Sequence, residues 1–169
     1  EPYELPAGQT AADLLARELA RPSYRPAPIA LGTNTDPYQP IERERKIMRG
    51  ILEVLERAGH PVGIVTKSAL VTRDIDILSR MAKRNLAKVA LSVTTLDPKL
   101  ARTMEPRAST PPKRLEAIKR LAEAGIPTTV MVAPVIPALN DSEIERILDA
   151  AVHAGAKEAS YVLLRLPLE

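Results

Sequence analysis

The sequence contains no cysteine, phenylalanine or tryptophan in its 169 residues, and aromatic residues make up only 2%. Without cysteine, these residues hold no disulfide, no thiolate metal ligand and no cysteine nucleophile. The core must therefore be built from leucine, isoleucine, valine, alanine and methionine. No apolar run approaches the ~18 residues of a membrane-spanning helix and no signal peptide is visible, so we expect a cytoplasmic protein without a membrane partner.

The motifs of several common enzyme classes are also absent. The chain has neither the phosphate-binding loops G-x-G-x-x-G and G-x-x-x-x-G-K-[ST] nor the H-E-x-x-H and G-x-S-x-G signatures of metalloproteases and serine hydrolases. The 24 basic and 21 acidic residues leave a net charge of +3. A nucleic-acid partner is compatible with so small an excess but is not supported by it.

Length and composition predict a single domain over residues 1–169. Hydrophobic residues make up 45% and charged residues 27%, which is ordinary for a soluble globular protein. Residues 1–28 are interpreted as a lead-in with one helix, whose start is predicted by Thr10 and by Asp13 three positions later. Residues 29–165 are interpreted as five strand–helix units. Because the chain starts at Glu1 rather than methionine, we expect it to belong to a longer protein.

Five short apolar runs alternate with stretches of helical periodicity. The runs are continuous rather than alternating, which is typical of an α/β fold whose parallel sheet is covered by helices. Five strands are too few to close an eight-stranded barrel, so an open partial barrel and a flat doubly wound sheet are the alternatives. We expect strands at 29–31, 62–65, 88–93, 128–132 and 159–164, and the longer helices at 11–20, 41–58, 72–84, 110–125 and 140–155.

Polar residues follow these strands where helices are about to begin. The first strand stops at Gly32 and is followed by Thr33, Asn34, Thr35 and Asp36. In an alternating strand–helix protein, this carboxyl end of a strand is where ligands bind. Asn34 and Asp36 could instead form a local turn stabilised by their own side chains.

Two later strands also end in polar side chains. Lys67 follows the second strand directly, where its ammonium could bind an anionic ligand. If the amine is desolvated, Lys67 could instead form a Schiff base with a substrate. The third alternative is an ordinary surface lysine without a function. Ser92 lies inside the apolar run V-A-L-S-V. Burying a hydroxyl without a partner costs about 1–3 kcal/mol, so Ser92 should be hydrogen-bonded, either within the fold or to a ligand.

Charged and amide residues on later loops complete the candidates. Glu105 and Arg107, in M-E-P-R, could pair with each other or present opposite charges to a zwitterionic ligand. Asn140 is predicted to cap the last helix, with Glu143 placed to bond back.

Taken in order, the strand-end motifs resemble those of the radical S-adenosylmethionine (SAM) enzymes, in the branch similar to spore photoproduct lyase. The resemblance covers about residues 29–165. The motifs that carry it are G-T-N-T-D (32–36), V-T-K (65–67), L-S-V (91–93), M-E-P (104–106), R-L-E-A (114–117), A-E-A-G (122–125) and V-A-P-V-I (132–136).

The resemblance implies a partial TIM-type barrel, with this chain supplying five strands of a (β/α)6 radical SAM barrel. It implies that Thr33, Asn34 and Thr35 contact the methionine amino group, and that Lys67 and Ser92 hold the carboxylate and ribose. Residues 133–136, including Ala133, Val135 and Ile136, would lie along the adenine. Glu105 and Arg107 join this candidate SAM site, and no catalytic residue is assigned.

The family also binds a 4Fe-4S cluster through C-x-x-x-C-x-x-C, which this chain lacks. In photoproduct lyase a hydrogen-donating cysteine stands where Thr33 stands here. We therefore expect the carboxyl-side part of a lyase-like enzyme that cleaves SAM reductively and abstracts hydrogen from an unknown substrate, inactive by itself. The alternatives are a Schiff-base lyase or aldolase using Lys67, and a non-catalytic ligand-binding module. The missing strand should leave a sheet edge exposed, which favours self-association.

Overall fold

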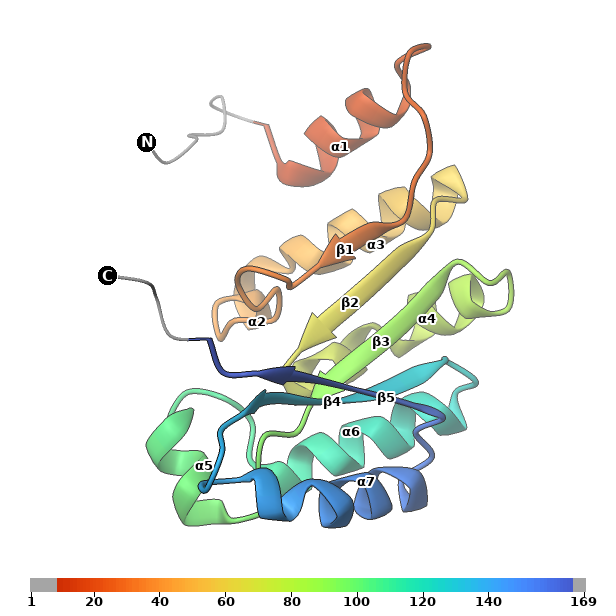
Figure 1. The fold of residues 1–169 in the computed structure, drawn as a ribbon. Helices are drawn as coiled ribbons and strands as arrows, with labels where there is room; N and C mark the ends of the chain where they lie inside the picture. The colour runs from red at the N-terminus through yellow and green to blue at the C-terminus, as the bar shows by residue number, and fades with distance from the viewer. Residues whose placement is uncertain (1–8, 166–169) are drawn as a thin grey trace.

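The computed structural model describes residues 9–165, in which five parallel strands form one sheet (Figure 1). The strands follow one another across the sheet in chain order, and each is parallel to its neighbour. This arrangement confirms the predicted α/β fold. The strands are β1 (Ile29–Leu31), β2 (Val62–Thr66), β3 (Ala87–Ser92), β4 (Thr128–Val135) and β5 (Glu158–Leu163).

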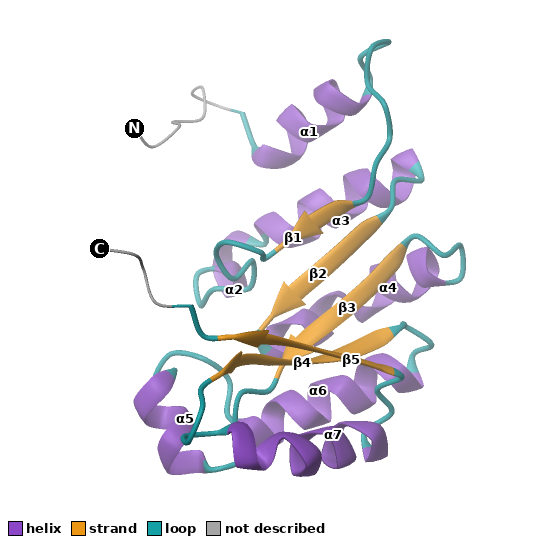
Figure 2. Ribbon diagram, viewed as in Figure 1, coloured by secondary structure: helices purple, strands orange, loops and turns teal. Residues whose placement is uncertain are grey.

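Helices connect successive strands, and those between β1 and β4 lie mostly behind the sheet in the view of Figure 2, while the helix before β5 lies below it. The face turned to the viewer has no described helix lying directly on it. The sheet therefore has a covered face and an open face, as expected for a barrel that is not closed. The helices are α1 (Ala11–Leu19), α2 (Glu42–Arg45), α3 (Ile47–Ala58), α4 (Ile75–Ala82), α5 (Pro98–Met104), α6 (Pro111–Glu123) and α7 (Ile144–His153), with 3-10 turns η1 (Ala69–Asp74) and η2 (Asp141–Glu143).

The core lies between the covered face of the sheet and the helices. Alternate strand residues point into it, such as Ile64 on β2, Val89 on β3 and Val130 on β4, each at most 2% exposed. Leu52 of α3 and Leu121 of α6 are fully buried against them. The predicted aliphatic core is confirmed, with Tyr38 as a buried aromatic addition.

Two predicted helices are wrong in detail. The helix expected over 41–58 is broken at Lys46, whose φ of 51° is left-handed. Both Glu42 carboxylate oxygens accept a hydrogen bond from Met48 N at 3.2 Å, which satisfies a free N–H at the start of α3. The helix expected over 72–84 begins earlier, as the 3-10 turn η1, because Ser68 accepts a hydrogen bond from Leu70 N.

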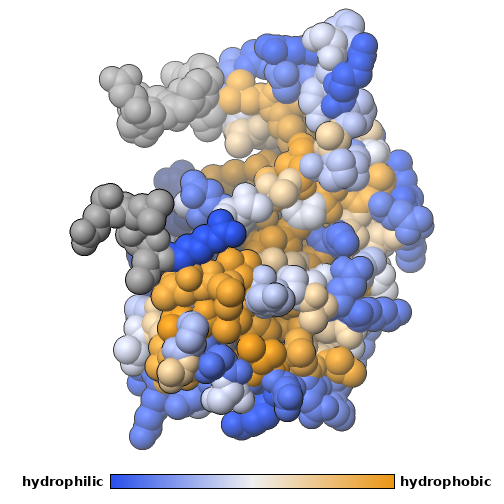
Figure 3. Space-filling model, in the orientation of Figure 1, coloured by the Kyte–Doolittle hydropathy of each residue, from blue (hydrophilic) through white to orange (hydrophobic). Residues whose placement is uncertain are grey.

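Both edges of the sheet are open within residues 9–165, because β1 and β5 each pair on one side only. The predicted exposed edge is therefore confirmed, while self-association through it stays a prediction. Every residue of β5 is exposed, including Tyr161 at 69% and Leu163 at 55%. Figure 3 shows apolar side chains gathered over the β4–β5 region. In the described part of the chain, no helix is long and apolar enough to cross a membrane.

Candidate functional site

The carboxyl ends of the parallel strands meet at one edge of the sheet, and this edge carries the predicted site. The register pairs Thr66 with Leu91 and Ser92 with Met131. Thr66 and Leu91 are buried, and each is followed along the chain by a predicted residue, Lys67 after β2 and Ser92 at the end of β3; Ser92 is itself only 3% exposed. The structure thus brings these two predicted residues next to each other on neighbouring strands.

The loop after β1 is fastened directly onto the end of β2. Gly32 has a φ of +93°, and a Cβ there would lie 1.9 Å from the Val65 carbonyl oxygen, so only glycine fits this crossing. Asp36 accepts hydrogen bonds from Thr66 Oγ1 and from the Lys67 backbone N–H, both at 2.7 Å. Asp36 also accepts the N–H of Tyr38 at 2.9 Å, which confirms the local turn for Asp36 but not for Asn34. The three bonds of Asp36 together form a clamp between this loop and the end of β2.

In the chain between Gly32 and Asp36, Thr33, Asn34 and Thr35 are all exposed. Their side chains are therefore available to a ligand at the strand ends. The clamp determines where this short exposed segment lies relative to Lys67, since one carboxylate binds both loops.

Lys67 is the most exposed member of an ion-pair cluster with Glu105 and the buried Arg114. The Lys67 ammonium lies 3.4 Å from Glu105 Oε1, and Arg114 Nη2 lies 2.5 Å from Glu105 Oε2. The Arg114 side chain is 2% exposed and also donates to the backbone oxygens of Ser92 at 2.9 Å and Ser109 at 2.6 Å. Two cations and one carboxylate leave this cluster with one positive charge. Arg114 was not predicted as a site residue, although the motif R-L-E-A that begins with it is part of the family resemblance, because its partner Glu105 is not identifiable from local sequence.

This cluster decides between the two readings of Glu105 and Arg107. Glu105 pairs with Lys67 and Arg114, and no ion pair joins it to Arg107. Arg107 is instead exposed on the loop after α5. The two residues therefore act in different places, one in the buried cluster and one at the surface.

The predicted cap at Asn140 is wrong. Asn140 is 0% exposed and makes no capping bond; its Nδ2 donates to the Thr94 oxygen at 2.8 Å and the Pro134 oxygen at 2.9 Å. Its Oδ1 accepts Ile136 N at 2.7 Å. A buried amide that ties the end of β3 to the loop after β4 satisfies backbone groups that a helix cap would leave unpaired. Glu143 likewise bonds across the fold, to Thr95 Oγ1 and Leu96 N.

The segment expected along the adenine forms the end of β4 and the turn after it. The Ala133 oxygen accepts Thr94 Oγ1 at 3.1 Å, and the N–H of Ile136 is bonded to Asn140. Val135 is 3% exposed, so its side chain belongs to the core rather than to an open wall. Ala133 and Ile136 are partly exposed and remain the candidates of this segment for contact with a ring.

A cleft of about 950 Å³ opens beside Lys67, between the loop after β1, η1 and the α5–α6 loop. Of the predicted site residues, Thr35, Lys67 and Arg107 line it. Another hollow, of about 650 Å³, lies along α1 around Leu14 and Arg21. It contains none of the predicted site residues, whereas the cleft beside Lys67 adjoins the predicted site through three of them.

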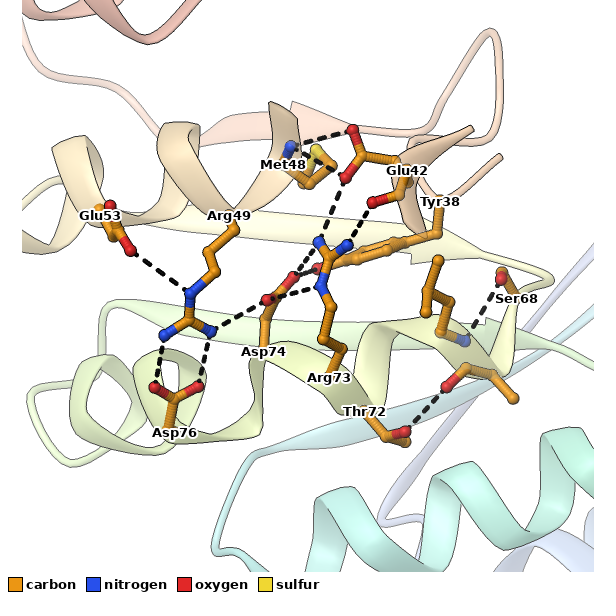
Figure 4. A network of polar contacts seen from close by, with 12 residues as sticks. Tyr38, Glu42, Met48, Arg49, Glu53, Ser68, Thr72, Arg73, Asp74 and Asp76 are labelled. Atoms are coloured by element: carbon orange, nitrogen blue, oxygen red, sulfur yellow. Dashed lines mark hydrogen bonds and ion pairs between the residues drawn. The ribbon is translucent and has the colours of Figure 1, made fainter. Parts of the chain in front are cut away.

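One wall of the cleft is supported by a polar network, drawn in Figure 4. Asp74 is 0% exposed and accepts hydrogen bonds from Tyr38 Oη at 3.0 Å, Arg73 Nη2 at 2.8 Å and Arg49 Nη1 at 3.2 Å. Burial, and then the neighbouring Asp74 charge, raise the pKa of the Tyr38 hydroxyl far above its ordinary value. Tyr38 therefore stays a neutral donor that holds the loop after β1 against η1.

Comparison with known proteins identifies the family. The model of the radical SAM superfamily matches residues 12–151. The chain therefore belongs to the radical SAM superfamily, and the resemblance seen in the strand-end motifs is confirmed.

Several relatives share this sequence over most of the chain. An uncharacterized protein of Mycobacterium tuberculosis is 42% identical over 147 residues, which is 86% of this chain and 43% of the relative. An uncharacterized protein of Methanocaldococcus jannaschii is 33% identical over 115 residues, which is 68% of this chain and 43% of the relative. The chain thus spans less than half the length of these curated relatives.

Solved structures share the fold. A spore photoproduct lyase mutant with bound AdoMet and dinucleoside spore photoproduct matches with a TM-score of 0.63 and 17% identity, over 92% of this chain and 46% of that chain. SuiB of Streptococcus suis bound to S-adenosylmethionine matches with a TM-score of 0.61 and 19% identity, over 82% of this chain and 30% of that one. These matches confirm the partial barrel and exclude the flat doubly wound alternative.

The family uses SAM together with a 4Fe-4S cluster, and the two fit these residues differently. The sequence has no cysteine, and residues 9–165 contain no group of three or more His, Cys, Asp or Glu side chains that could hold a metal ion. The cluster therefore does not fit this chain. SAM fits better, because the single net positive charge around Lys67 matches one carboxylate at the carboxyl ends of the strands.

Proposed function

We propose that this chain forms the SAM-binding, carboxyl-side part of a radical SAM enzyme. The observation that carries the proposal is the Lys67–Glu105–Arg114 cluster, which presents one net positive charge at the carboxyl ends of the strands of a radical SAM barrel. A methionine carboxylate is the part of SAM that such a charge binds.

The remaining contacts follow from the placement of the predicted residues. The exposed Thr33, Asn34 and Thr35 contact the methionine amino group, next to the Lys67 ammonium that binds the carboxylate. Ser92 follows Leu91, the register partner of Thr66, and although it is only 3% exposed its hydroxyl contacts the ribose. Ala133 and Ile136 lie against the adenine. Glu105 orients Lys67 through its ion pair, and Arg107, which lines the cleft, contacts SAM at the surface of the site.

SAM, once bound and reduced in enzymes of this family, supplies the radical that removes hydrogen from a substrate. In our proposal, the residues of this chain bind and orient SAM, and the cluster ligands lie outside these 169 residues. The absence of cysteine and the 43% coverage of the curated relatives support this division. The chain by itself is then inactive and binds SAM weakly.

Neither alternative function is favoured. A Schiff-base lysine needs apolar surroundings or a neighbouring cation, whereas the Lys67 side chain is 37% exposed and paired with a carboxylate. A non-catalytic binding module is less well supported than an enzyme part, because the family match spans residues 12–151.

The decisive experiment uses a longer polypeptide that contains these residues together with the cluster-binding cysteines. After anaerobic reconstitution with iron and sulfide and chemical reduction, SAM is added and 5′-deoxyadenosine is measured. We expect product, and a decrease of about tenfold or more in Lys67→Ala, which loses one charge-assisted hydrogen bond.

Lys83→Ala is the matched control, because Lys83 is an exposed lysine between α4 and β3, near the amino ends of the strands and away from the site. It should leave the product yield unchanged. Normal product from Lys67→Ala would remove Lys67 from the SAM site, and no product from a cluster-loaded wild type would reject the proposed function.

A further inference from the structure

The cleft beside Lys67 is much more strongly basic than the chain as a whole. Overall the sequence is nearly balanced, with 24 basic and 21 acidic residues. The cleft has six cationic residues in its lining and one acidic residue, Asp36. The cations are Arg43, Lys67, Arg73, Arg107, Lys113 and Arg120.

Most of this positive charge is not neutralised within the fold. Arg73 is paired with Asp74 and Glu42, and Lys67 with Glu105. The other four cations have no acidic partner within ion-pair distance anywhere in residues 9–165. Asp36 forms an ion pair with none of these four cations, and its two oxygens accept hydrogen bonds from Thr66 Oγ1 and from the backbone N–H groups of Lys67 and Tyr38.

The walls of the cleft also present hydroxyl groups. Ser109 Oγ accepts the N–H of Ala69 at 2.8 Å, so its own proton remains available to an acceptor. Thr110 precedes α6 without making a side-chain capping bond. Thr72 Oγ1 accepts Arg120 Nη1 at 3.1 Å, and this bond holds the guanidinium at the cleft. Because α6 begins with two prolines, which have no N–H, its first two positions offer no backbone donor to the cleft.

We propose that this cleft binds a phosphate group of the substrate. Four unpaired cations exceed what one carboxylate would neutralise, and guanidinium forks with hydroxyl donors match the oxygens of a phosphate. The volume of about 950 Å³ suits a ligand of the size of a phosphorylated metabolite or a short nucleotide segment. The assignment to the substrate rests on the proposed function, since the cleft adjoins the SAM site through Thr35 and Lys67.

The test measures binding of pyrophosphate to the 169-residue chain by calorimetry at low salt, without SAM or iron. The variant Arg43→Gln/Lys113→Gln/Arg120→Gln should bind about tenfold or more weakly, from a two- to fivefold loss for each exposed charge pair. The control Arg57→Gln/Lys83→Gln/Lys157→Gln removes the same charge from exposed positions that precede β2, β3 and β5, near the amino ends of the strands. This variant should bind pyrophosphate like the wild type. Circular dichroism of both variants checks that they fold.

Further probes identify the chemistry. Citrate, a carboxylate of similar charge, should bind more weakly than pyrophosphate. Binding of a single-stranded octanucleotide with the same dependence on the variant would identify a phosphodiester as the source of the phosphate, and its absence would identify a small phosphorylated molecule.

Three outcomes would overturn the proposal: no pyrophosphate binding, equal weakening by both triple variants, or equal affinity for citrate. Because this binding is measured without SAM, its failure leaves the 5′-deoxyadenosine result unaffected, and the two proposals can fail separately.

Discussion

Arg114 carries a positive charge at 2% side-chain exposure, and Glu105 is its charged partner. A charge taken out of water is tolerated only when it is paired and its donors are satisfied. Arg114 meets both conditions, since its guanidinium also reaches the Ser92 and Ser109 oxygens. One side chain thereby joins the end of β3, the loop after α5 and the start of α6 beneath Lys67.

We expect Arg114→Met to lower the free energy of unfolding by about 3–5 kcal/mol, because it leaves the Glu105 carboxylate without its main partner. Urea unfolding followed by circular dichroism measures this. The double variant Arg114→Met/Glu105→Gln should recover part of the loss, since it removes the unpaired charge as well.

Lys67→Met is the control at the same carboxylate. It removes the partly exposed partner and should cost less than about 1 kcal/mol. A loss in Arg114→Met as small as that of the control would contradict a structural role for the buried pair.

At the scale of elements, ion pairs between helices set how the loops at the site are supported. Arg49 of α3 contacts Asp74 at 3.2 Å and Asp76 of α4 at 2.8 Å. Glu42 and Arg73 join the same network from the α2 and η1 segments, as Figure 4 shows. The segments that follow β1 and β2 are thus held to each other, and the cleft between them keeps its shape.

This network predicts an acid dependence of stability. The hydrogen bond from Arg49 holds the pKa of Asp76 below its ordinary value of 3.8. The contribution of Asp76 is therefore complete above that ordinary pKa and is lost as the pH falls through the lowered value of the folded state. Asp76→Asn should cost about 0.5 kcal/mol at neutral pH and nothing in strong acid, so the two stability curves converge.

Urea unfolding between neutral pH and strong acid measures that convergence. Glu116→Gln on α6 is the control, because no ion pair involves this exposed carboxylate in the described part of the chain. Curves for Asp76→Asn and wild type that stay parallel down to strong acid would show that Arg49 does not act through Asp76.

At the scale of the whole molecule, the sheet is an incomplete barrel, with two open edges in the part of the chain that the structure describes. Among residues 9–165, β5 pairs only with β4, and all of its residues are exposed. An edge with exposed apolar residues can pair with another chain.

We expect the 169-residue chain to self-associate with rising concentration in analytical ultracentrifugation. The variant Tyr161→Lys/Leu163→Lys should shift it toward monomer, because charges on an edge strand oppose pairing. Val152→Lys, an exposed apolar position on helix α7, is the control and should have less effect. A strictly monomeric wild type at every concentration would contradict the prediction.

Local patterns predicted much of the fold correctly. β1 has the expected bounds, and β2 and β4 begin at the expected residues, Val62 and Thr128. Thr10 and Asp13 form the predicted capping box. Each of these features depends on residues within a few positions of one another, which is why periodicity and cap chemistry are enough to predict them.

The partners of the polar side chains at the site could not be predicted in this way. Tyr38 and Asp74 are 36 residues apart, and Asn140 is 46 residues from Thr94. Asn140 fits a helix cap by its local sequence, yet in the fold it lies between two strand ends whose backbone groups need partners.

The alternation of strands and helices, the radical SAM family and the lack of cysteine ligands in these 169 residues follow from residue types and their order along the chain. Only the tertiary structure decided that Glu105 pairs with Lys67 and Arg114, and that unpaired cations gather around one cleft. The physical reason is that charge pairing depends on which strand ends and loops lie together after folding, and distance along the chain does not specify it.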